Sequence, residues 1–140
     1  VDPATVHQSK FSMGTVLALV ARFGQAGLAE FDAHFRDEAT RDFRDRVHMA
    51  LDAEVDAAYP RRWIGKVTVR TRDGRVLEGR VDEPKGDPGN TLSRDEITAK
   101  ALRLAAFSGG ADEAEMRDAI AALWRVADAA KVAPLLGAKA

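Results

Sequence analysis

The chain has 140 residues, of which 46% are hydrophobic and 31% are charged, and its formal net charge is −1. Lys and Arg (21) balance Asp and Glu (22), so the sequence lacks the basic surplus typical of a nucleic-acid-binding protein. It contains no cysteine, which excludes disulfides, a thiolate nucleophile and a cysteine-based zinc site, and we expect a cytoplasmic protein.

The first strong signal is an uncharged run, Phe11–Ala21. It is too short to cross a bilayer, which takes about 20 apolar residues, so we expect no membrane partner. Ser12 is a plausible N-cap and Gly24 suits a left-handed C-terminal cap, which predicts a helix over Met13–Phe23. Apolar residues occupy nearly every face of this helix. We therefore expect it to be buried all round, against a second domain or a second copy of the chain.

Three weaker patterns follow this helix. Apolar spacing predicts a short helix over Leu28–Phe35 and a charged surface helix over Ala39–Val47. Apolar residues then alternate with His48, Ala50, Asp52 and Glu54, which predicts a strand over Val47–Glu54. Residues 57–62, which contain Tyr59-Pro60, are predicted to form a loop.

The clearest local pattern is a β-hairpin. In residues 66–72 and 77–82, apolar or small residues alternate with polar or charged ones, and Asp73-Gly74 lies between the two segments. An Asp-Gly pair supplies the positive φ angles of a tight primed turn. The polar face of this hairpin is expected to face water or a partner.

The C-terminal third carries two helix-start signals. After a turn-rich loop, Pro84–Asn90, Ser93 and Glu96 have the spacing of a capping box, and Asp112 with Glu115 opens a second helix. Lys131–Ala140 is predicted to be a fraying terminus. Helices and strands are thus segregated along the chain, which predicts an α+β fold in which a small antiparallel sheet packs against helices in two layers.

Three stretches together resemble the C-terminal part of the MmgE/PrpD family. They are H-Q-S-K-F-S-M-G-T-V at His7–Val16, K-V-T-V-R-T-R-D-G-R at Lys66–Arg75 and G-D-P-G-N-T-L-S-R-D-E-I-T-A-K at Gly86–Lys100. Thr91 stands where the family usually has proline. The family includes 2-methylcitrate dehydratases, cis-aconitate decarboxylases and an iminodisuccinate epimerase.

The resemblance implies that residues 1–140 form one domain, most of an α+β lid that closes over a larger, all-helical domain absent from this sequence. The parent enzyme would be a dehydratase, a lyase acting on a small polycarboxylate such as 2-methylcitrate. Most catalytic residues of such enzymes lie outside the matching stretches, so no catalytic residue is assigned here and the chain alone is expected to be inactive. The resemblance implies no metal and no other cofactor.

Three residues at the start of the first long helix are candidates for substrate binding. The N-terminus of a helix attracts anions, and Lys10, Ser12 and His7 lie just before it, so a carboxylate would pair with Lys10 and accept a hydrogen bond from Ser12. The alternative is that Ser12 only caps the helix while Lys10 and His7 are solvated. His34 and His48 lack a second ligand at metal-binding spacing, which favours surface or structural roles.

A different function remains open. The chain also fits a non-enzymatic α+β module that binds a small acid or forms a homodimer through its apolar first helix. Both alternatives predict a homo-oligomer, because each leaves an apolar helix in need of a partner surface.

Overall fold

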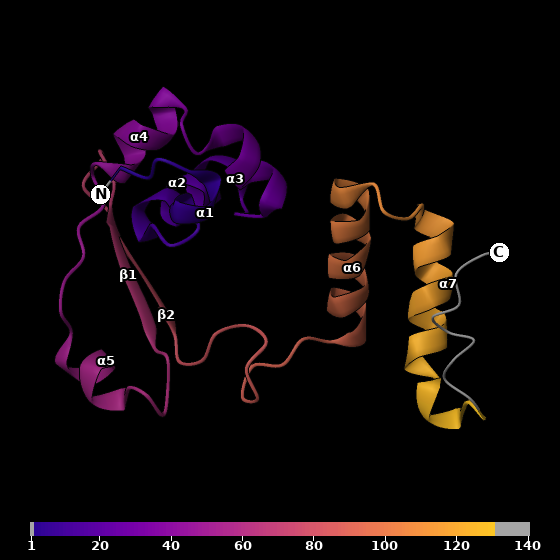
Figure 1. Cartoon of the computed structure of the whole chain (residues 1–140). Coiled ribbons are helices and arrows are strands. Elements are labelled where there is room, and N and C mark those ends of the chain that lie inside the picture. The colour runs from indigo at the N-terminus through magenta and orange to yellow at the C-terminus, as the bar shows by residue number, and fades with distance from the viewer. Residues whose placement is uncertain (1, 131–140) are drawn as a thin grey trace. The chain divides into compact units, whose positions relative to one another are not determined.

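A computed structural model describes residues 2–130 and divides the chain into two compact units, with the boundary between Asp52 and Ala53 (Figure 1). The first unit contains α1 (Val6–Ser9), α2 (Met13–Phe23), α3 (Leu28–His34) and α4 (Glu38–Arg44). The second contains α5 (Ala53–Ala58), β1 (Gly65–Arg70), β2 (Val76–Val81), α6 (Arg94–Ser108), α7 (Glu113–Trp124) and a short 3₁₀ turn, Val126–Asp128. The predicted α+β class is confirmed. The fraying terminus predicted at Lys131–Ala140 lies outside the described residues.

Helix α2 begins and ends where the sequence predicts. The Ser12 hydroxyl accepts a hydrogen bond from the Thr15 backbone N–H at 3.3 Å, which satisfies one of the free donors of the first turn. Gly24 follows the last turn with φ of 76°, a left-handed conformation that costs glycine little. These two local caps set the length of the helix.

The first unit has a core in which α2 packs against α4 and α3. Its buried side chains come from every helix: Ser9 of α1; Thr15, Ala18 and Leu19 of α2; Phe31 and Phe35 at α3; Thr40 and Arg44 of α4. The chain by itself does not bury α2 all round, so the predicted burial against a second domain or a second copy stays a prediction. Val20 and Phe23 are 43% and 39% exposed because the surrounding helices cover only part of its circumference.

The predicted strand over Val47–Glu54 is also wrong. Residues 47–52 form neither strand nor helix, and helix α5 begins at Ala53. Alternation alone does not make a strand, because a strand needs a partner for its backbone groups. Among residues 2–130, β1 pairs with β2 alone. Met49 and Leu51 are 75% and 90% exposed, so the alternation buries no face.

The β-hairpin is confirmed, but its turn differs from the prediction. The strands pair antiparallel from Gly65 opposite Val81 to Arg70 opposite Val76. Beyond them, the Thr71 N–H donates to the Arg75 carbonyl at 2.9 Å and the Gly74 N–H donates to the Thr71 carbonyl at 3.1 Å. Gly74 has φ of 85°, whereas no residue other than glycine has a positive φ among residues 2–130. The loop is therefore a three-residue turn completed by glycine rather than a primed turn.

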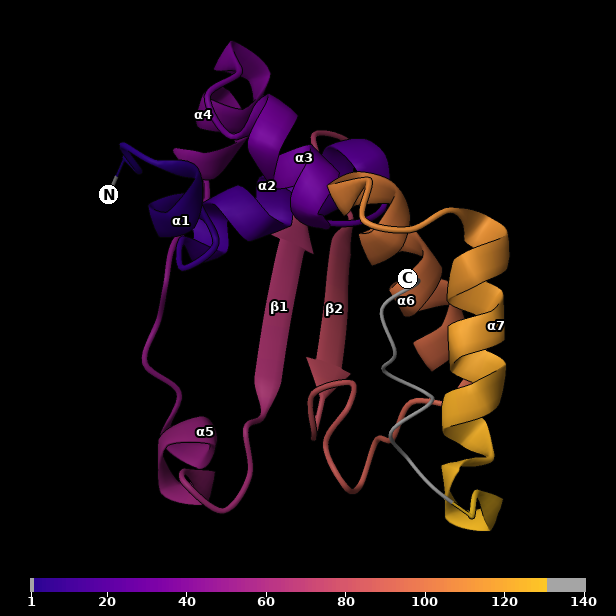
Figure 2. The ribbon, with the colours of Figure 1, turned by 45° about the vertical axis from the view of Figure 1, so that its right-hand side comes forward.

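The two faces of the hairpin differ in chemistry. Opposite residues share a face, so Val67, Val69, Leu77 and Val81 gather on one side, while Lys66, Glu78 and Arg80 lie on the other. The two strands run side by side in Figure 2. All six residues of each strand are exposed, so the burial of one sheet face under helices, expected from the sequence, is not found among the described residues.

Helices α6 and α7 pack against each other within the second unit, and both have the predicted capping boxes (Figure 2). Ser93 and Glu96 exchange hydrogen bonds with each other's backbone N–H at 3.2 and 2.7 Å. The Glu96 carboxylate also pairs with Lys85 at 2.9 Å. The backbone N–H of Ser93 and then Lys85 lower the pKa of Glu96 to about 2.

Candidate functional site

Of the predicted binding residues, Lys10 and Ser12 lie on the turn between α1 and α2, and His7 lies in α1. Ser12 is half-buried, and its oxygen accepts hydrogen bonds from the Thr15 N–H and the Thr15 hydroxyl. The Ser12 hydroxyl proton is then left to donate to another acceptor. Its capping role is established by this geometry, and its role toward a ligand stays a prediction.

Lys10 and His7 are both exposed. The His7 ring packs edge-on against Phe11 with ring centroids 5.2 Å apart, and the Lys10 ammonium makes no ion pair with residues 2–130. Within the described part of the chain, no hydrogen bond or ion pair joins the side chains of Lys10, His7 and Ser12. The three residues are close in sequence and precede the positive, N-terminal end of α2, a helix of 11 residues.

Two backbone donors at this helix end are free. Within residues 2–130, the N–H groups of Met13 and Gly14 have no hydrogen-bond acceptor, whereas those of Thr15 and Val16 are satisfied by Ser12. Free N–H groups of this kind and the helix dipole together favour an anion.

Sequence reasoning missed one residue next to this helix end, Arg44. Helix α4 brings it against Gly14, where an added methyl group would lie only 2.7 Å from Arg44 Cγ. Only 8% of Arg44 is exposed. Its Nη2 pairs with Asp2 at 2.7 Å, and its Nη1 has no hydrogen-bond partner within residues 2–130. The sequence predicts a solvated arginine here, since nothing in a charged surface-helix pattern signals burial.

A second polar cluster ties three helices of the first unit together. Asp37 accepts hydrogen bonds from Arg22 and His34, both at 2.9 Å, and Arg22 also donates to Thr40. The His34 ring stacks on Phe23 with centroids 4.5 Å apart. Arg22 and then His34 lower the pKa of Asp37. The cluster joins α2, α3 and the start of α4, which agrees with the structural role predicted for His34.

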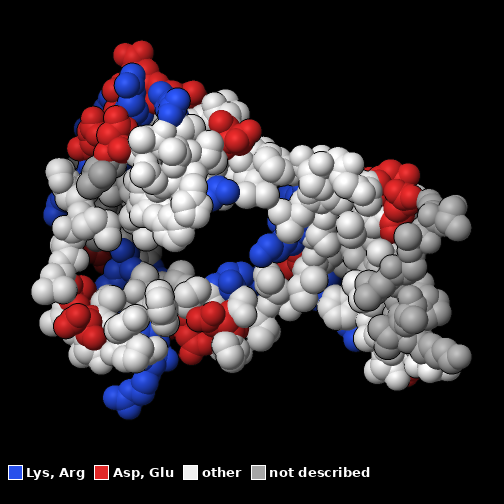
Figure 3. All heavy atoms as spheres, in the orientation of Figure 1, with Lys and Arg blue, Asp and Glu red and all other residues white. Residues whose placement is uncertain are grey.

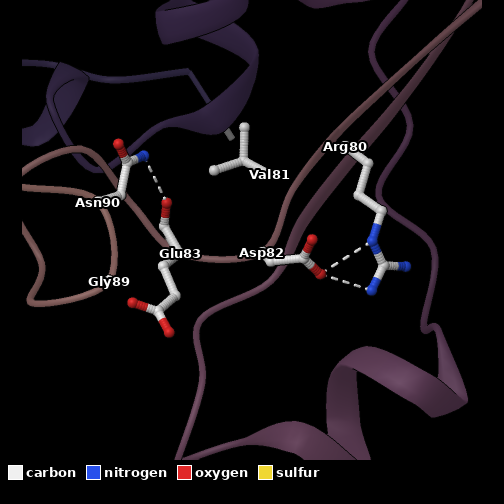
Figure 4. A pocket seen from close by; sticks show the side chains of 6 residues that line it. All are labelled: Arg80, Val81, Asp82, Glu83, Gly89 and Asn90. Atoms are coloured by element: carbon white, nitrogen blue, oxygen red, sulfur yellow. Dashed lines mark hydrogen bonds and ion pairs between the residues drawn. The ribbon is translucent and has the colours of Figure 1, made fainter.

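The second unit has an open hollow of about 370 Å³ between the end of β2 and the following loop (Figure 4). Its lining residues are Arg80, Val81, Asp82, Glu83, Gly89 and Asn90. Figure 4 shows Arg80 held by Asp82, with both bonds at 2.7–3.0 Å, and the same guanidinium binds Glu54 of α5. Since its charge is already satisfied by two carboxylates, Arg80 is a poor anchor for an acidic ligand.

The loop beside this hollow is internally bonded. Asn90 Nδ2 donates to the Glu83 carbonyl at 3.0 Å, and the Gly86 N–H donates to the Asn90 carbonyl at 2.8 Å. These bonds favour a folded connector between β2 and α6 over a flap that closes on a ligand. We therefore place the candidate site at the start of α2.

Comparison with known families gives one match. The model of the MmgE/PrpD C-terminal domain covers residues 1–126 of the 140-residue chain. The chain belongs to the MmgE/PrpD C-terminal domain family. A search of curated proteins and a search of solved structures found no match.

Three further observations concern membrane crossing, metal binding and surface charge in this MmgE/PrpD domain. Within residues 2–130, no helix has the length and apolar character that crossing a bilayer requires, and no group of three acidic or histidine side chains is arranged to hold a metal ion. On the face shown in Figure 3, positive and negative side chains lie next to one another around α4, and broad uncharged areas separate the charged clusters.

Proposed function

We propose that this MmgE/PrpD C-terminal domain is the lid of a lyase that dehydrates a small polycarboxylate such as 2-methylcitrate. The observation that carries the proposal is the start of α2, where two free N–H groups lie beside Lys10 and the Ser12 hydroxyl in a domain of this family. A carboxylate of the substrate would accept hydrogen bonds from these N–H groups and pair with Lys10.

In such a dehydration, a base removes the proton on the carbon next to a carboxylate. The electron pair of that C–H bond forms the carbon–carbon double bond, and the hydroxyl leaves as water after an acid protonates it. The lid residues described here would hold the carboxylate and exclude water while a helical partner domain supplies the acid and base. This chain alone is then expected to be inactive.

The exposed side of α2 supports a partner domain. Phe11 and Met13 are 79% and 51% exposed, and Val20 and Phe23 continue the apolar surface along the helix. Apolar surface of this kind on one helix is typical of a docking face. We propose that the helical domain covers it in the parent protein, and that the isolated chain self-associates through the same face.

The binding proposal is tested by titrating 2-methylcitrate into the full chain by calorimetry. Lys10→Ala removes the lysine ammonium just before the helix, so we expect about a tenfold weaker affinity, as for loss of one charge-assisted hydrogen bond. Lys85→Ala is the matched control, because Lys85 is paired with Glu96 in the second unit. Equal affinities for the wild type and Lys10→Ala would remove the support for this site.

The activity is tested separately. The chain is assayed for turnover of 2-methylcitrate alone and after addition of a helical domain from an MmgE/PrpD protein. We expect no turnover by the chain alone and measurable turnover by the mixture. Turnover by the chain alone would contradict the assignment of the catalytic groups to another domain.

A non-enzymatic module is the second candidate, and the exposed apolar face of the hairpin favours it. Val67, Val69, Leu77 and Val81 are 39–50% exposed on that face. In light scattering, a dimer whose mass stays constant across protein concentrations, and does not change when the helical domain is added, would favour this module. A mass that rises with concentration and falls when the helical domain is added would favour the lid.

A further inference from the structure

We propose that Arg44 binds a second carboxylate of the acid held at the start of α2, which makes the site selective for polycarboxylates over single carboxylates. This inference rests on the proposed function, since it assumes that the same helix end holds the first carboxylate. It adds a residue that no motif or family match assigns.

The burial of Arg44 is the first argument. A guanidinium carries five N–H donors, and a buried donor without an acceptor costs free energy because it has lost its water. Arg44 is 8% exposed, yet its Nη1 is buried and has no hydrogen-bond partner within residues 2–130. A bound water, ion or ligand can supply the missing acceptor of such a group, and we infer a ligand at Arg44.

The position of Arg44 is the second argument. Its Cγ lies so close to Gly14 that an added methyl group there would be 2.7 Å away. Gly14 is also one of the two residues with a free N–H at the start of α2. The side-chain stem of the buried arginine therefore packs on a residue that also offers a free N–H, and the arginine and the helix end each lack an acceptor that a carboxylate would provide.

The present partner of Arg44 is the third argument. Asp2 places a carboxylate oxygen 2.7 Å from Nη2, while its own side chain is 71% exposed. Asp45, the neighbouring acidic residue, lies farther away at 3.9 Å from Nε. The guanidinium thus already donates to a carboxylate that solvent reaches. A ligand carboxylate that displaces Asp2 would place one oxygen at Nη2 and the other at the unpaired Nη1. Planar paired hydrogen bonding makes arginine well suited to this role.

The test uses the full chain with citrate as the polycarboxylate and with acetate and inorganic phosphate as comparison ligands. Affinities are measured by calorimetry, and the Arg44 side-chain N–H signals are followed by NMR. We expect citrate to bind at least tenfold more tightly than acetate and to shift the Arg44 signals. Phosphate binding as tight as citrate would overturn the carboxylate assignment.

Two variants isolate the competition with Asp2. Asp2→Asn removes the internal carboxylate from Arg44, so we expect citrate to bind several-fold more tightly. Asp45→Asn removes the same charge at a greater distance and is expected to change the affinity less. Arg44→Lys should lower the affinity about tenfold, since it loses the paired geometry. If that variant does not fold, the citrate affinities of Asp2→Asn and Asp45→Asn still test whether Arg44 binds the ligand.

The outcomes separate this inference from the proposed function. If citrate binds and Lys10→Ala weakens it, while Asp2→Asn matches Asp45→Asn and the Arg44 signals stay unmoved, the inference about Arg44 is wrong and the helix-end site stands. If the Arg44 signals shift while Lys10→Ala has no effect, the role of Lys10 is wrong. Failure of the wild type to bind citrate at all would overturn both.

Discussion

The two units of the chain differ in how they are held together. The first, residues 2–52, buries side chains from all four of its helices, among them Leu19, Phe31 and Phe35. In the second, only Ile64 and Ala105 are buried among residues 53–130. The first unit is held by side-chain packing between helices, and the second by backbone pairing, caps and surface ion pairs.

The comparison teaches where a partner surface is needed. The hairpin and the pair α6–α7 satisfy their own backbone groups but leave apolar side chains such as Leu77 and Leu123 half-exposed. Burial of apolar surface is the main favourable term in folding, so elements with little of it are less stable on their own. The four predictions below test this contrast.

The largest effect is expected in the core of the first unit. Leu19 is fully buried, so Leu19→Ala should lower the free energy of unfolding by about 2–5 kcal/mol, as for other core leucines. Leu77→Ala in the hairpin is the matched control, and about 1 kcal/mol or less is expected because Leu77 is 50% exposed. Urea unfolding followed by circular dichroism measures both. Similar losses of unfolding free energy in the two variants would contradict the proposed difference in packing between the units.

The second-largest loss of stability is expected where α2 and α4 pack closely. Gly14→Ala places a methyl group 2.7 Å from Arg44 Cγ, and such overpacking typically costs about 1–3 kcal/mol. Gly65→Ala is the control in the second unit, since nothing lies within 4 Å of an added methyl group there. Thermal unfolding of both variants gives the comparison. An unchanged melting temperature for Gly14→Ala would mean that α2 and α4 do not approach so closely.

The helix caps should have similar effects in both units. Ser12→Ala and Ser93→Ala each remove an N-cap hydroxyl, and each should lower stability by about 0.5–2 kcal/mol. Ser12→Ala has a second expected result, a weaker affinity for 2-methylcitrate in calorimetry, which Ser93→Ala should not show. A loss of stability without a loss of affinity would show that Ser12 caps the helix and does not bind the ligand.

The smallest effect is expected for the ion pairs of α5 with the hairpin. Arg80 and then Lys66 hold the pKa of Glu54 at about 2, below its ordinary value of 4.5. A lowered pKa stabilises the fold above the ordinary value, and this contribution is lost as the pH falls from 4.5 through 2. Glu54→Gln should therefore lower the melting temperature slightly at pH 7, and the difference from wild type should shrink with acidification.

An exposed carboxylate provides the control for that variant. Glu78→Gln, on β2, removes a carboxylate that forms no ion pair within residues 2–130 and should leave the melting temperature at pH 7 unchanged. An NMR titration of Glu54 measures its pKa directly. A value near 4.5 would show that the contacts with Arg80 and Lys66 do not persist in solution.

Most local elements could be predicted because their signals are local. Ser12, Gly24, Ser93 and Asp112 act on N–H and carbonyl groups a few residues away, so the helix ends follow from sequence spacing. The strand over Val47–Glu54 failed for the opposite reason. Its alternation resembles that of β1, but a strand requires a partner, and spacing along one segment does not show whether a partner exists.

In the candidate site too, the residues that are close in sequence could be predicted, and the distant one could not. Lys10, Ser12 and the start of α2 were predicted, because a cap and a helix end are adjacent in sequence. Arg44 lies 30 positions after Gly14, and only the packing of α4 on α2 brings the two together. Its burial and its unpaired Nη1 therefore had no signal in the sequence.

The sequence by itself determined the family, the α+β class and the ends of the long helices, since these depend on residue order and on interactions within one or two turns. The tertiary structure decided which apolar side chains are covered, that β1 and β2 form the sheet without a third strand among residues 2–130, and that an arginine is buried beside Gly14. The physical reason is that burial and pairing depend on contacts between segments distant along the chain, and these are set by packing rather than by local spacing.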